Sequence, residues 1–258
     1  MNIRFRTRDD LTFLLTDTHN SVGISRGANE LNLDIVEKTY NSGGVFIGER
    51  RLSTKELNIT VDLNYSTDTT YRDAYNDIAY YAASCEYIED TDNSLRTKVE
   101  LMAIEESQDT PENMLRAGQV KLVFRQLTPF WEDLTAQTDT DTGTDLTFSI
   151  NNSGVIDCPP TFTITASALC NTLRLYISDP VRGIEIQDTI FGNNTTLDEY
   201  VINCADGTAL LGDDGYDRAD RIKSGSGYFD FPVGSFTLSA EFSVSCQCDI
   251  SWRRRYYV

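Results

Sequence analysis

Histidine is almost absent from this 258-residue chain, since His19 is the only one. General acid–base, nucleophilic and metal sites commonly use histidine, so His19 would have to serve in most of them. It lies in the polar stretch Asp17–Asn20, which favours a solvent-exposed turn residue. A phosphate-binding glycine loop and a nucleophile elbow are absent as well. These absences remove most acid–base, nucleophilic and nucleotide-binding hypotheses, and we expect no cofactor.

Basic residues and long apolar runs are also scarce. The chain has 22 Lys and Arg against 40 Asp and Glu, a net charge of −18. Without a broad basic surface, sequence-specific binding of nucleic acid is not expected. No apolar run approaches the ~20 residues that span a bilayer, and Met1–Asp10 does not have the pattern of a secretory signal. We expect no membrane insertion, and folding in the cytosol.

A strict alternation of apolar and polar residues occupies Phe236–Trp252. Period-two patterning predicts β-structure with one buried and one wet face. Strands rarely exceed ~10 residues, so we interpret the run as a hairpin with its turn near Ala240–Ser243. Cys246 and Cys248 continue the apolar parity. They and the other four cysteines are therefore expected to be reduced, buried thiols rather than disulfide or metal ligands.

The N-terminal half is predicted to be a β-rich domain with one helix. Helical spacing of apolar residues marks Thr70–Ala83, and this amphipathic helix should lie on a sheet. Strands are predicted at Lys55–Leu63, Thr97–Ile104 and Gln119–Leu127, the last ending before Pro129. The polar stretch Glu105–Gly118 is predicted to be an exposed loop.

The composition changes at Leu134–Asp145, where Thr and Asp dominate, and we interpret this stretch as a linker. The predicted domains are residues 1–138 and 139–258. Short strands separated by turns fill the second half, which predicts a β-sandwich or jelly roll without a convincing helix. Before the terminal run they are expected at Leu146–Ile150, Thr161–Thr165, Thr172–Ser178, Gly183–Gln187, Tyr200–Asn203 and Gly227–Phe231. The fold class predicted for the whole chain is mainly β.

Two acidic clusters raise the question of calcium. Asp139, Asp141 and Asp145 alternate with other residues, and Asp213, Asp214, Asp217 and Asp220 form a second group. Alternate oxygen ligands in a loop can bind calcium, but neither stretch has the distal bidentate Glu of a calcium loop. We therefore favour a solvated linker and a polar loop, and no metal.

Aromatic residues near polar turns could contact sugar rings, although core packing of a sandwich explains most of them. The group consists of Tyr176, Tyr200, Tyr216, Tyr228 and Phe229. Tyr216, between Gly215 and Asp217, is the one expected to be exposed and to contact a glycan.

Arginines gather at both ends of the chain, at Arg4, Arg6 and Arg8 and at Arg253–Arg255. In an acidic protein they could pair with the acidic surface of a neighbouring subunit. Simple solvation of alternate strand positions is the favoured interpretation.

Several weak motifs, taken in order, resemble the siphophage distal tail protein family, and the resemblance covers nearly the whole chain. The motifs are Gly43-Gly44 before Glu49-Arg50-Arg51 and Leu57–Leu63, the helix Tyr71–Ala83, Val120–Leu127 closing in Thr128-Pro129-Phe130-Trp131, Asn151–Gly154 before Pro159-Pro160, and Phe231-Pro232-Val233-Gly234 before the terminal run to Trp252-Arg253-Arg254. Family members often have Asn soon after the glycine that matches Gly234, where this chain has Ser235 and Phe236.

The resemblance implies a structural protein of the virion tail tip that is not an enzyme and is made in the cytoplasm of the bacterial host. Family members form rings, typically hexameric, through an N-terminal domain similar to tail-tube subunits. A C-terminal sandwich, similar to carbohydrate-binding modules, projects outward. The ring joins the tail-tube protein to the tail-tip protein and often to receptor-binding proteins. DNA passes through the ring, and an acidic channel would repel it.

Two alternatives remain at this point. The first is a carbohydrate-binding β-sandwich protein that contacts the host cell surface, and the second, less favoured, is a glycan hydrolase. A hydrolase would need a pair of carboxylates at a set spatial separation, which a sequence does not reveal.

Overall fold

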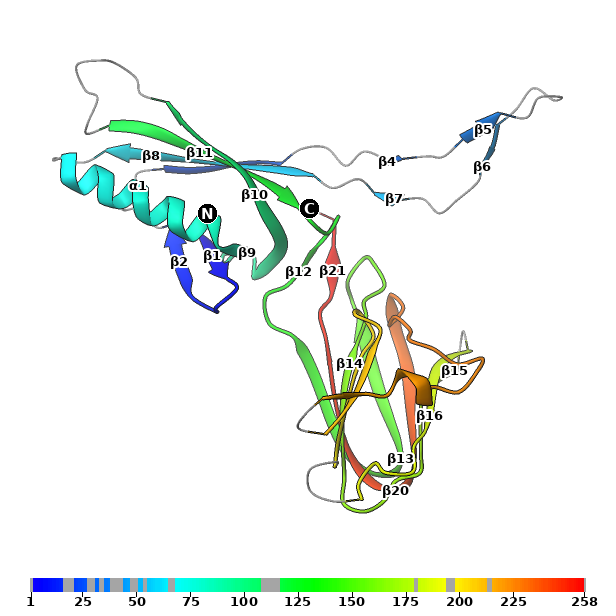
Figure 1. The fold of residues 1–258 in the computed structure, drawn as a ribbon. Helices are drawn as coiled ribbons and strands as arrows, with labels where there is room; N and C mark the ends of the chain where they lie inside the picture. The colour runs from blue at the N-terminus through cyan, green and yellow to red at the C-terminus, as the bar shows by residue number, and fades with distance from the viewer. Residues whose placement is uncertain are drawn as a thin grey trace. The chain divides into compact units, whose positions relative to one another are not determined.

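The computed structural model describes residues 2–15, 21–26, 31–32, 35–37, 44–46, 51–52, 55–64, 68–107, 117–178, 181–193, 198–212 and 215–257. The chain divides into two compact units. The first comprises Met1–Leu134 with Tyr257–Val258, and the second comprises Thr135–Tyr256. Both are built mainly of β-strands (Figure 1), which confirms the predicted fold class.

The N-terminal unit is built around one sheet in the order β2-β1-β9-β10-β11-β8-β3, with β12 beside β10. These strands pair antiparallel. Their bounds are β1 Ile3–Thr7, β2 Thr12–Leu15, β3 Ser21–Arg26, β8 Glu56–Asn64, β9 Cys85–Asp90, β10 Leu95–Ser107, β11 Ala117–Gln126 and β12 Trp131–Asp133. Two short pairs lie outside this sheet, β4 (Leu31–Asn32) with β7 (Arg51–Leu52) and β5 (Ile35–Glu37) with β6 (Gly44–Phe46).

Helix α1, Asp68–Ala83, lies against this sheet and contacts β1, β8, β10 and β11 (Figure 1). Its buried side chains, Tyr71, Ala74, Ile78 and Ala82, recur every three or four residues and so share one face. They meet the inward side chains of the strands, which include Leu57, Ile59 and Val61. The predicted amphipathic helix is therefore confirmed.

The strands predicted in this unit also form. β11 ends at Gln126, before Pro129, as expected. β10 continues to Ser107 and β11 begins at Ala117, so both ends of the predicted loop Glu105–Gly118 belong to strands. His19, Gly43, Glu49 and Arg50 lie outside the described residues.

The C-terminal unit is a sandwich whose sheet order is β16-β15-β20-β14-β17-β18-β19, with β13 paired along β20. The bounds are β13 Gln137–Asn152, β14 Thr161–Ala166, β15 Thr172–Ser178, β16 Val181–Gln187, β17 Glu199–Asn203, β18 Thr208–Leu211, β19 Tyr216–Asp217, β20 Gly234–Trp252 and β21 Arg255–Tyr256. A short 3-10 helix follows β19 at Ala219–Arg221.

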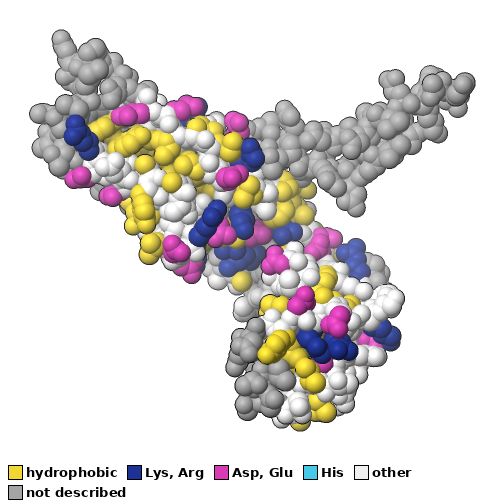
Figure 2. All heavy atoms as spheres, viewed as in Figure 1, with side chains coloured by type: hydrophobic (Ala, Val, Ile, Leu, Met, Phe, Trp, Pro, Cys, Tyr) yellow, Lys and Arg dark blue, Asp and Glu magenta, His cyan; other side chains and the backbone are white. Residues whose placement is uncertain are grey.

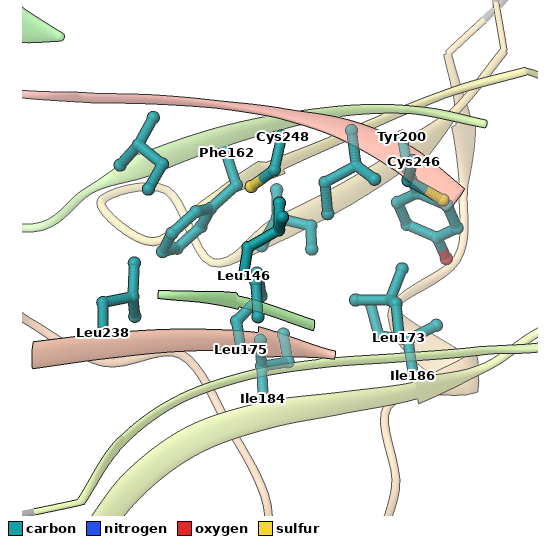
Figure 3. Packing of buried hydrophobic residues seen from close by; sticks show 14 of the residues in the cluster. Leu146, Phe162, Leu173, Leu175, Ile184, Ile186, Tyr200, Leu238, Cys246 and Cys248 are labelled. Carbon is teal, nitrogen blue, oxygen red and sulfur yellow. The ribbon is translucent and has the colours of Figure 1, made fainter. Parts of the chain in front are cut away.

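Side chains from two layers of strands point toward one another in the sandwich core (Figure 3). Phe162, Tyr200 and Cys248 come from one side, and Leu175 and Ile184 from the other. All five are at most 1% exposed. The alternating pattern of each strand therefore builds one continuous dry interior.

The terminal run forms one strand, so the predicted hairpin with a turn near Ala240–Ser243 is wrong. β20 pairs with β15 over Leu238–Phe242 and with β14 over Cys246–Ser251. Its register with β13 shifts between these two parts, at Gly143. The strand thus passes from one layer to the other through an irregularity. Alternate residues are apolar in both of its halves, because both halves face the same core.

Two further predictions in the C-terminal half need correction. Leu134–Asp145 is not a linker, because β13 begins at Gln137 and pairs with β20 from there. Gly227–Phe231 forms no strand, and only Phe231 makes an isolated bridge, to Cys158. Strands β18 and β19 were not predicted. The described sandwich does confirm the other strands, and its one short helical turn agrees with the expected lack of helix.

Candidate functional site

A groove of about 910 Å³ on the C-terminal unit is the candidate site. Residues of β15 and β16 line one side of it, and the segment Lys223–Asp230, here called the strap, lines the other. Its volume is within the range of small-ligand sites, which is about 300–1,000 Å³. Charged side chains of both signs face it together with two tyrosines: Arg174, Arg182, Glu185, Lys223, Asp230, Tyr176 and Tyr228.

Strand alternation explains how β15 brings its side chains to the groove. Leu173, Leu175 and Ile177 are buried in the core, so Arg174 and Tyr176 point to the outer face. Gly183 of β16 lies directly opposite Tyr176 in the register. A β-carbon at Gly183 would lie 2.6 Å from the Tyr176 β-carbon and 2.5 Å from the Leu175 carbonyl oxygen, so the close approach of the strands here requires glycine.

Ion pairs link the charged side chains across three strands. Arg174 Nη1 donates to Glu241 at 2.8 Å, and its Nε lies 3.6 Å from Glu185. Lys223 Nζ donates to Glu185 at 2.9 Å, and this hydrogen bond is the main reason that the pKa of Glu185 is lowered. The Tyr176 hydroxyl donates to Glu241 at 2.7 Å, which raises the pKa of Tyr176. The polar side chains of the groove are thus held by one another.

The strap is bound to the edge of β16 by backbone hydrogen bonds. The Lys223 amide donates to the Glu185 carbonyl at 2.8 Å, and the Gly227 amide donates to the Gly183 carbonyl at 2.9 Å. Ser226 Oγ accepts from the Glu185 amide at 3.1 Å. These bonds occupy the exposed edge of the sheet with chain from the same molecule.

A buried ion pair fixes the chain just before the strap. Arg218 donates to both carboxylate oxygens of Asp188, at 2.7 Å each. The exposed fractions of these side chains are 16% and 2%. Burial opposes ionisation of Asp188, but hydrogen bonds from Arg218 and from the Ile190 amide hold its pKa below the usual value.

The structure places Tyr216 in β19, paired with Leu211, and outside the lining of the groove. It is 55% exposed, which confirms the expected exposure, whereas its contact with a glycan stays a prediction. Tyr200 and Phe229 are buried, as core packing requires. Tyr176 and Tyr228 are the aromatic residues of the group whose half-buried side chains face the groove.

The first acidic cluster does not form a loop. Asp139, Asp141 and Asp145 belong to β13, and Asp139 lines a pocket of about 490 Å³ with Asp249. Asp213 and Asp214 lie outside the described residues. Asp217 accepts from the Ala219 amide at 3.0 Å, and Asp220 pairs with Arg221 at 3.2 Å. Within the described ranges, no group of three potential metal-binding side chains converges.

All six cysteines are free, and five of them are buried. Cys246 and Cys248 belong to the sandwich core, where the alternation of β20 predicts them. Desolvation raises the pKa of Cys248 to about 12, so the buried thiol stays protonated.

The N-terminal arginines have a partner in their own unit. Glu89, whose side chain is fully buried, pairs with Arg4 and lies 3.5 Å from Arg6. Neither a neighbouring subunit nor simple solvation is needed to account for these two residues. At the other end of the chain, Arg254 donates to Ser153 at 2.9 Å.

Sequence reasoning missed Arg174, Arg182, Glu185, Lys223 and Asp230, because the groove forms only when the strap folds onto β16. One signal was present in the sequence. Arg174 and Tyr176 alternate with the apolar residues of a predicted strand, so the pattern predicts that both side chains face outward. The pattern does not predict which residues they contact.

The C-terminal sandwich has a sequence match to a known protein family. Residues 153–256 match the family model described as siphovirus-type tail component, C-terminal domain. This stretch lies within the sandwich and includes the groove. The comparison with curated protein sequences gave no match.

Solved structures extend the likeness to both units. The crystal structure of SPP1 Dit (gp 19.1), described as a paradigm of the hub adsorption apparatus in phages that infect Gram-positive bacteria, aligns with a TM-score of 0.66 at 14% identity. It covers 92% of this chain and 92% of that one. A chain of the phage P2 baseplate in its activated conformation with Ca aligns with a TM-score of 0.55 at 10% identity, covering 98% and 97%. The same baseplate with Sr gives 0.54 at 10% identity, with the same coverage.

These matches confirm the resemblance to the siphophage distal tail family, by sequence over 153–256 and by fold over nearly the whole chain. They support a component of a phage tail or baseplate with the Dit fold. In the described part of the chain, no helix has the length and apolar character required to cross a membrane.

Proposed function

We propose that this protein is the distal tail subunit of a siphophage and forms a ring, most simply a hexamer, at the end of the tail tube. The observation that carries this proposal is the likeness to SPP1 Dit across both units, with 92% of each chain covered. A likeness confined to the sandwich would fit many binding modules equally well.

In this proposal the N-terminal domain, residues 1–138, forms the ring, and the C-terminal domain, residues 139–258, projects from it. The ring joins the tail-tube protein to the tail-tip protein and to receptor-binding proteins. Its role is structural and not enzymatic. The protein is made in the host cytoplasm and becomes part of the virion tail. The net charge of −18 supports passage of DNA through the ring without adhesion, because like charges repel phosphate.

An exposed aromatic surface on the N-terminal unit supports contact with a second copy. Hydrophobic side chains gather on the face of this unit that Figure 2 shows. Tyr80 of α1 is 61% exposed and meets Tyr81 edge-on at 5.3 Å. Tyr81 in turn stacks on Phe13 of β2 at 4.6 Å. Exposed aromatic side chains of this kind are enriched in protein interfaces.

The location in the virion provides a direct test. Gold-labelled antibody raised against the purified chain should bind intact virions of the phage that encodes it, at the distal end of the tail. Labelling of the capsid, labelling along the tail tube, or virions that lack the protein would contradict the proposal. Virions of an unrelated siphophage serve as the control.

A further inference from the structure

The cations of the groove are already compensated by carboxylates. Arg174 pairs with Glu241 and Glu185, and Lys223 pairs with Glu185 at 2.9 Å. Arg182 lies 3.5 Å from Asp157. A phosphate or sulfate would have to displace these carboxylates, and a cationic ligand would have to displace the basic groups. The charge balance therefore favours an uncharged ligand.

These ion pairs nevertheless leave hydrogen-bonding capacity at the groove. A guanidinium has five N–H donors, an ammonium has three, and a carboxylate has about four lone-pair sites. Arg174 donates to Glu241, and Glu185 accepts from Lys223 and Gln187, so these groups use only part of this capacity. A hydroxyl group both donates and accepts, so a ligand rich in hydroxyls matches donors and acceptors that are fixed side by side.

The strap leaves room for a ring-shaped ligand and supplies an apolar contact. At Gly225 and Gly227 an added β-carbon would find no atom within 4 Å, so open space adjoins both residues. The half-buried ring of Tyr228 also lines the groove. Polar groups beside an aromatic surface are the common composition of a sugar site.

A peptide strand is a less suitable ligand. Peptides that join a sheet bind to a free edge strand, and β16 is the edge of its sheet. The strap already occupies that edge through the Lys223 and Gly227 amides. The side-chain face of the groove therefore remains as the binding surface.

We propose that this groove binds an uncharged oligosaccharide. Arg174, Glu185 and Lys223 hydrogen-bond its hydroxyls, and Tyr228 packs against a sugar ring. The inference goes beyond the proposed ring and does not depend on it, since every residue involved belongs to one C-terminal unit. A single site of this size binds weakly, and several copies in one assembly would increase the overall affinity.

The test is titration of the full-length protein with neutral oligosaccharides of hexose and N-acetylhexosamine, in parallel with their phosphorylated and sulfated analogues. Glycan-array screening selects the probes, and calorimetry measures the affinity. We expect neutral probes to bind, and charged analogues to bind at least ten-fold more weakly.

Two variants locate the site. Glu185→Gln keeps the side-chain shape but removes the charge, and Ser224→Trp fills the groove without touching the ion pairs. Each should weaken binding at least ten-fold with an unchanged circular dichroism spectrum. Glu199→Gln, an exposed change on β17, is the matched control and should bind like the wild type.

The inference is overturned if no neutral oligosaccharide binds at millimolar concentration, if charged analogues bind better, or if both groove variants bind like the wild type. Tyr216→Ala separately tests the predicted contact at β19, and an unchanged affinity in that variant would remove it. Ring formation is measured independently of glycan binding. If the wild-type protein forms rings but binds no glycan, this inference is refuted and the proposed ring is not.

Discussion

At the scale of single residues, the ion pair between Asp188 and Arg218 is a largely buried contact close to the groove in sequence. It precedes the strap, and both of its hydrogen bonds measure 2.7 Å. The Arg218 amide also donates to the Ala209 carbonyl at 2.7 Å, which fixes its backbone beside β18. Removal of one charged side chain from a buried ion pair leaves the opposite charge buried without a partner.

Asp188→Asn should therefore lower the stability of the C-terminal unit by about 3 kcal/mol, at the lower end of the cost of such changes. The measurement is urea denaturation of the full chain at pH 7. Asp220→Asn removes the carboxylate of the exposed pair with Arg221 and should cost less than about 1 kcal/mol. Equal effects of the two substitutions would contradict the importance of the buried pair.

The same pair predicts a pH dependence. The pKa of Asp188 is lower in the folded state than in the unfolded state, so its contribution is complete above the unfolded value of about 3.9. It is lost as pH falls through the folded pKa. The stability difference between wild type and Asp188→Asn should be constant from pH 7 to about pH 5 and should shrink below pH 4. A difference that persists unchanged to pH 2 would contradict this assignment.

At the scale of elements, the sequence predicted which residues are buried better than it predicted which strands pair. The alternation in Phe236–Trp252 correctly places Cys246 and Cys248 inside. It does not distinguish two short strands from one long strand, because both have the same period. The pairing of β20 with β14 and β15 joins residues about 60 to 90 positions apart in the chain, and local pattern carries no information about that.

The linker prediction failed for a related reason. Asp residues and the lack of apolar residues in the first part of β13 favour exposed coil, yet the backbone of this stretch is held by β20. Tertiary pairing overrides local preference in such a strand.

Gly183 on β16 is an element-scale feature that substitution can test. An added β-carbon would lie within 3 Å of the Leu175 carbonyl oxygen and of Tyr176, so β15 and β16 would have to shift apart. Gly183→Ala should lower the stability by about 1–3 kcal/mol, the usual cost of overpacking. Thermal unfolding measures this change.

Gly227→Ala is the matched control, since nothing lies within 4 Å of its added β-carbon. It should leave the melting temperature nearly unchanged. If the two variants melt at the same temperature, the close approach of the strands at Gly183 does not constrain the fold.

At the scale of the whole molecule, the sequence motifs taken in order indicate the family, although each motif alone is weak. Their order reflects the order of elements in the fold, which the comparison with SPP1 Dit reproduces over both units. The groove could not be predicted in this way, because it combines β15 with residues about 50 positions further along the chain.

Ring formation is the main proposal at this scale. Closed rings need head-to-tail contacts between copies, and the exposed Tyr80 offers an apolar anchor for one side of such a contact. Tyr80→Ser should therefore raise the concentration needed for assembly at least ten-fold, with little change in the stability of the monomer. Tyr216→Ser, at a tyrosine of similar exposure on the C-terminal unit, should assemble like the wild type.

Electron microscopy of the purified wild-type protein at tens of micromolar, combined with native mass spectrometry of the same sample, decides whether the chain assembles as proposed. We predict closed rings of six copies with an open centre. Monomers or open filaments under all conditions, with no closed ring in any class average, would contradict the proposed ring.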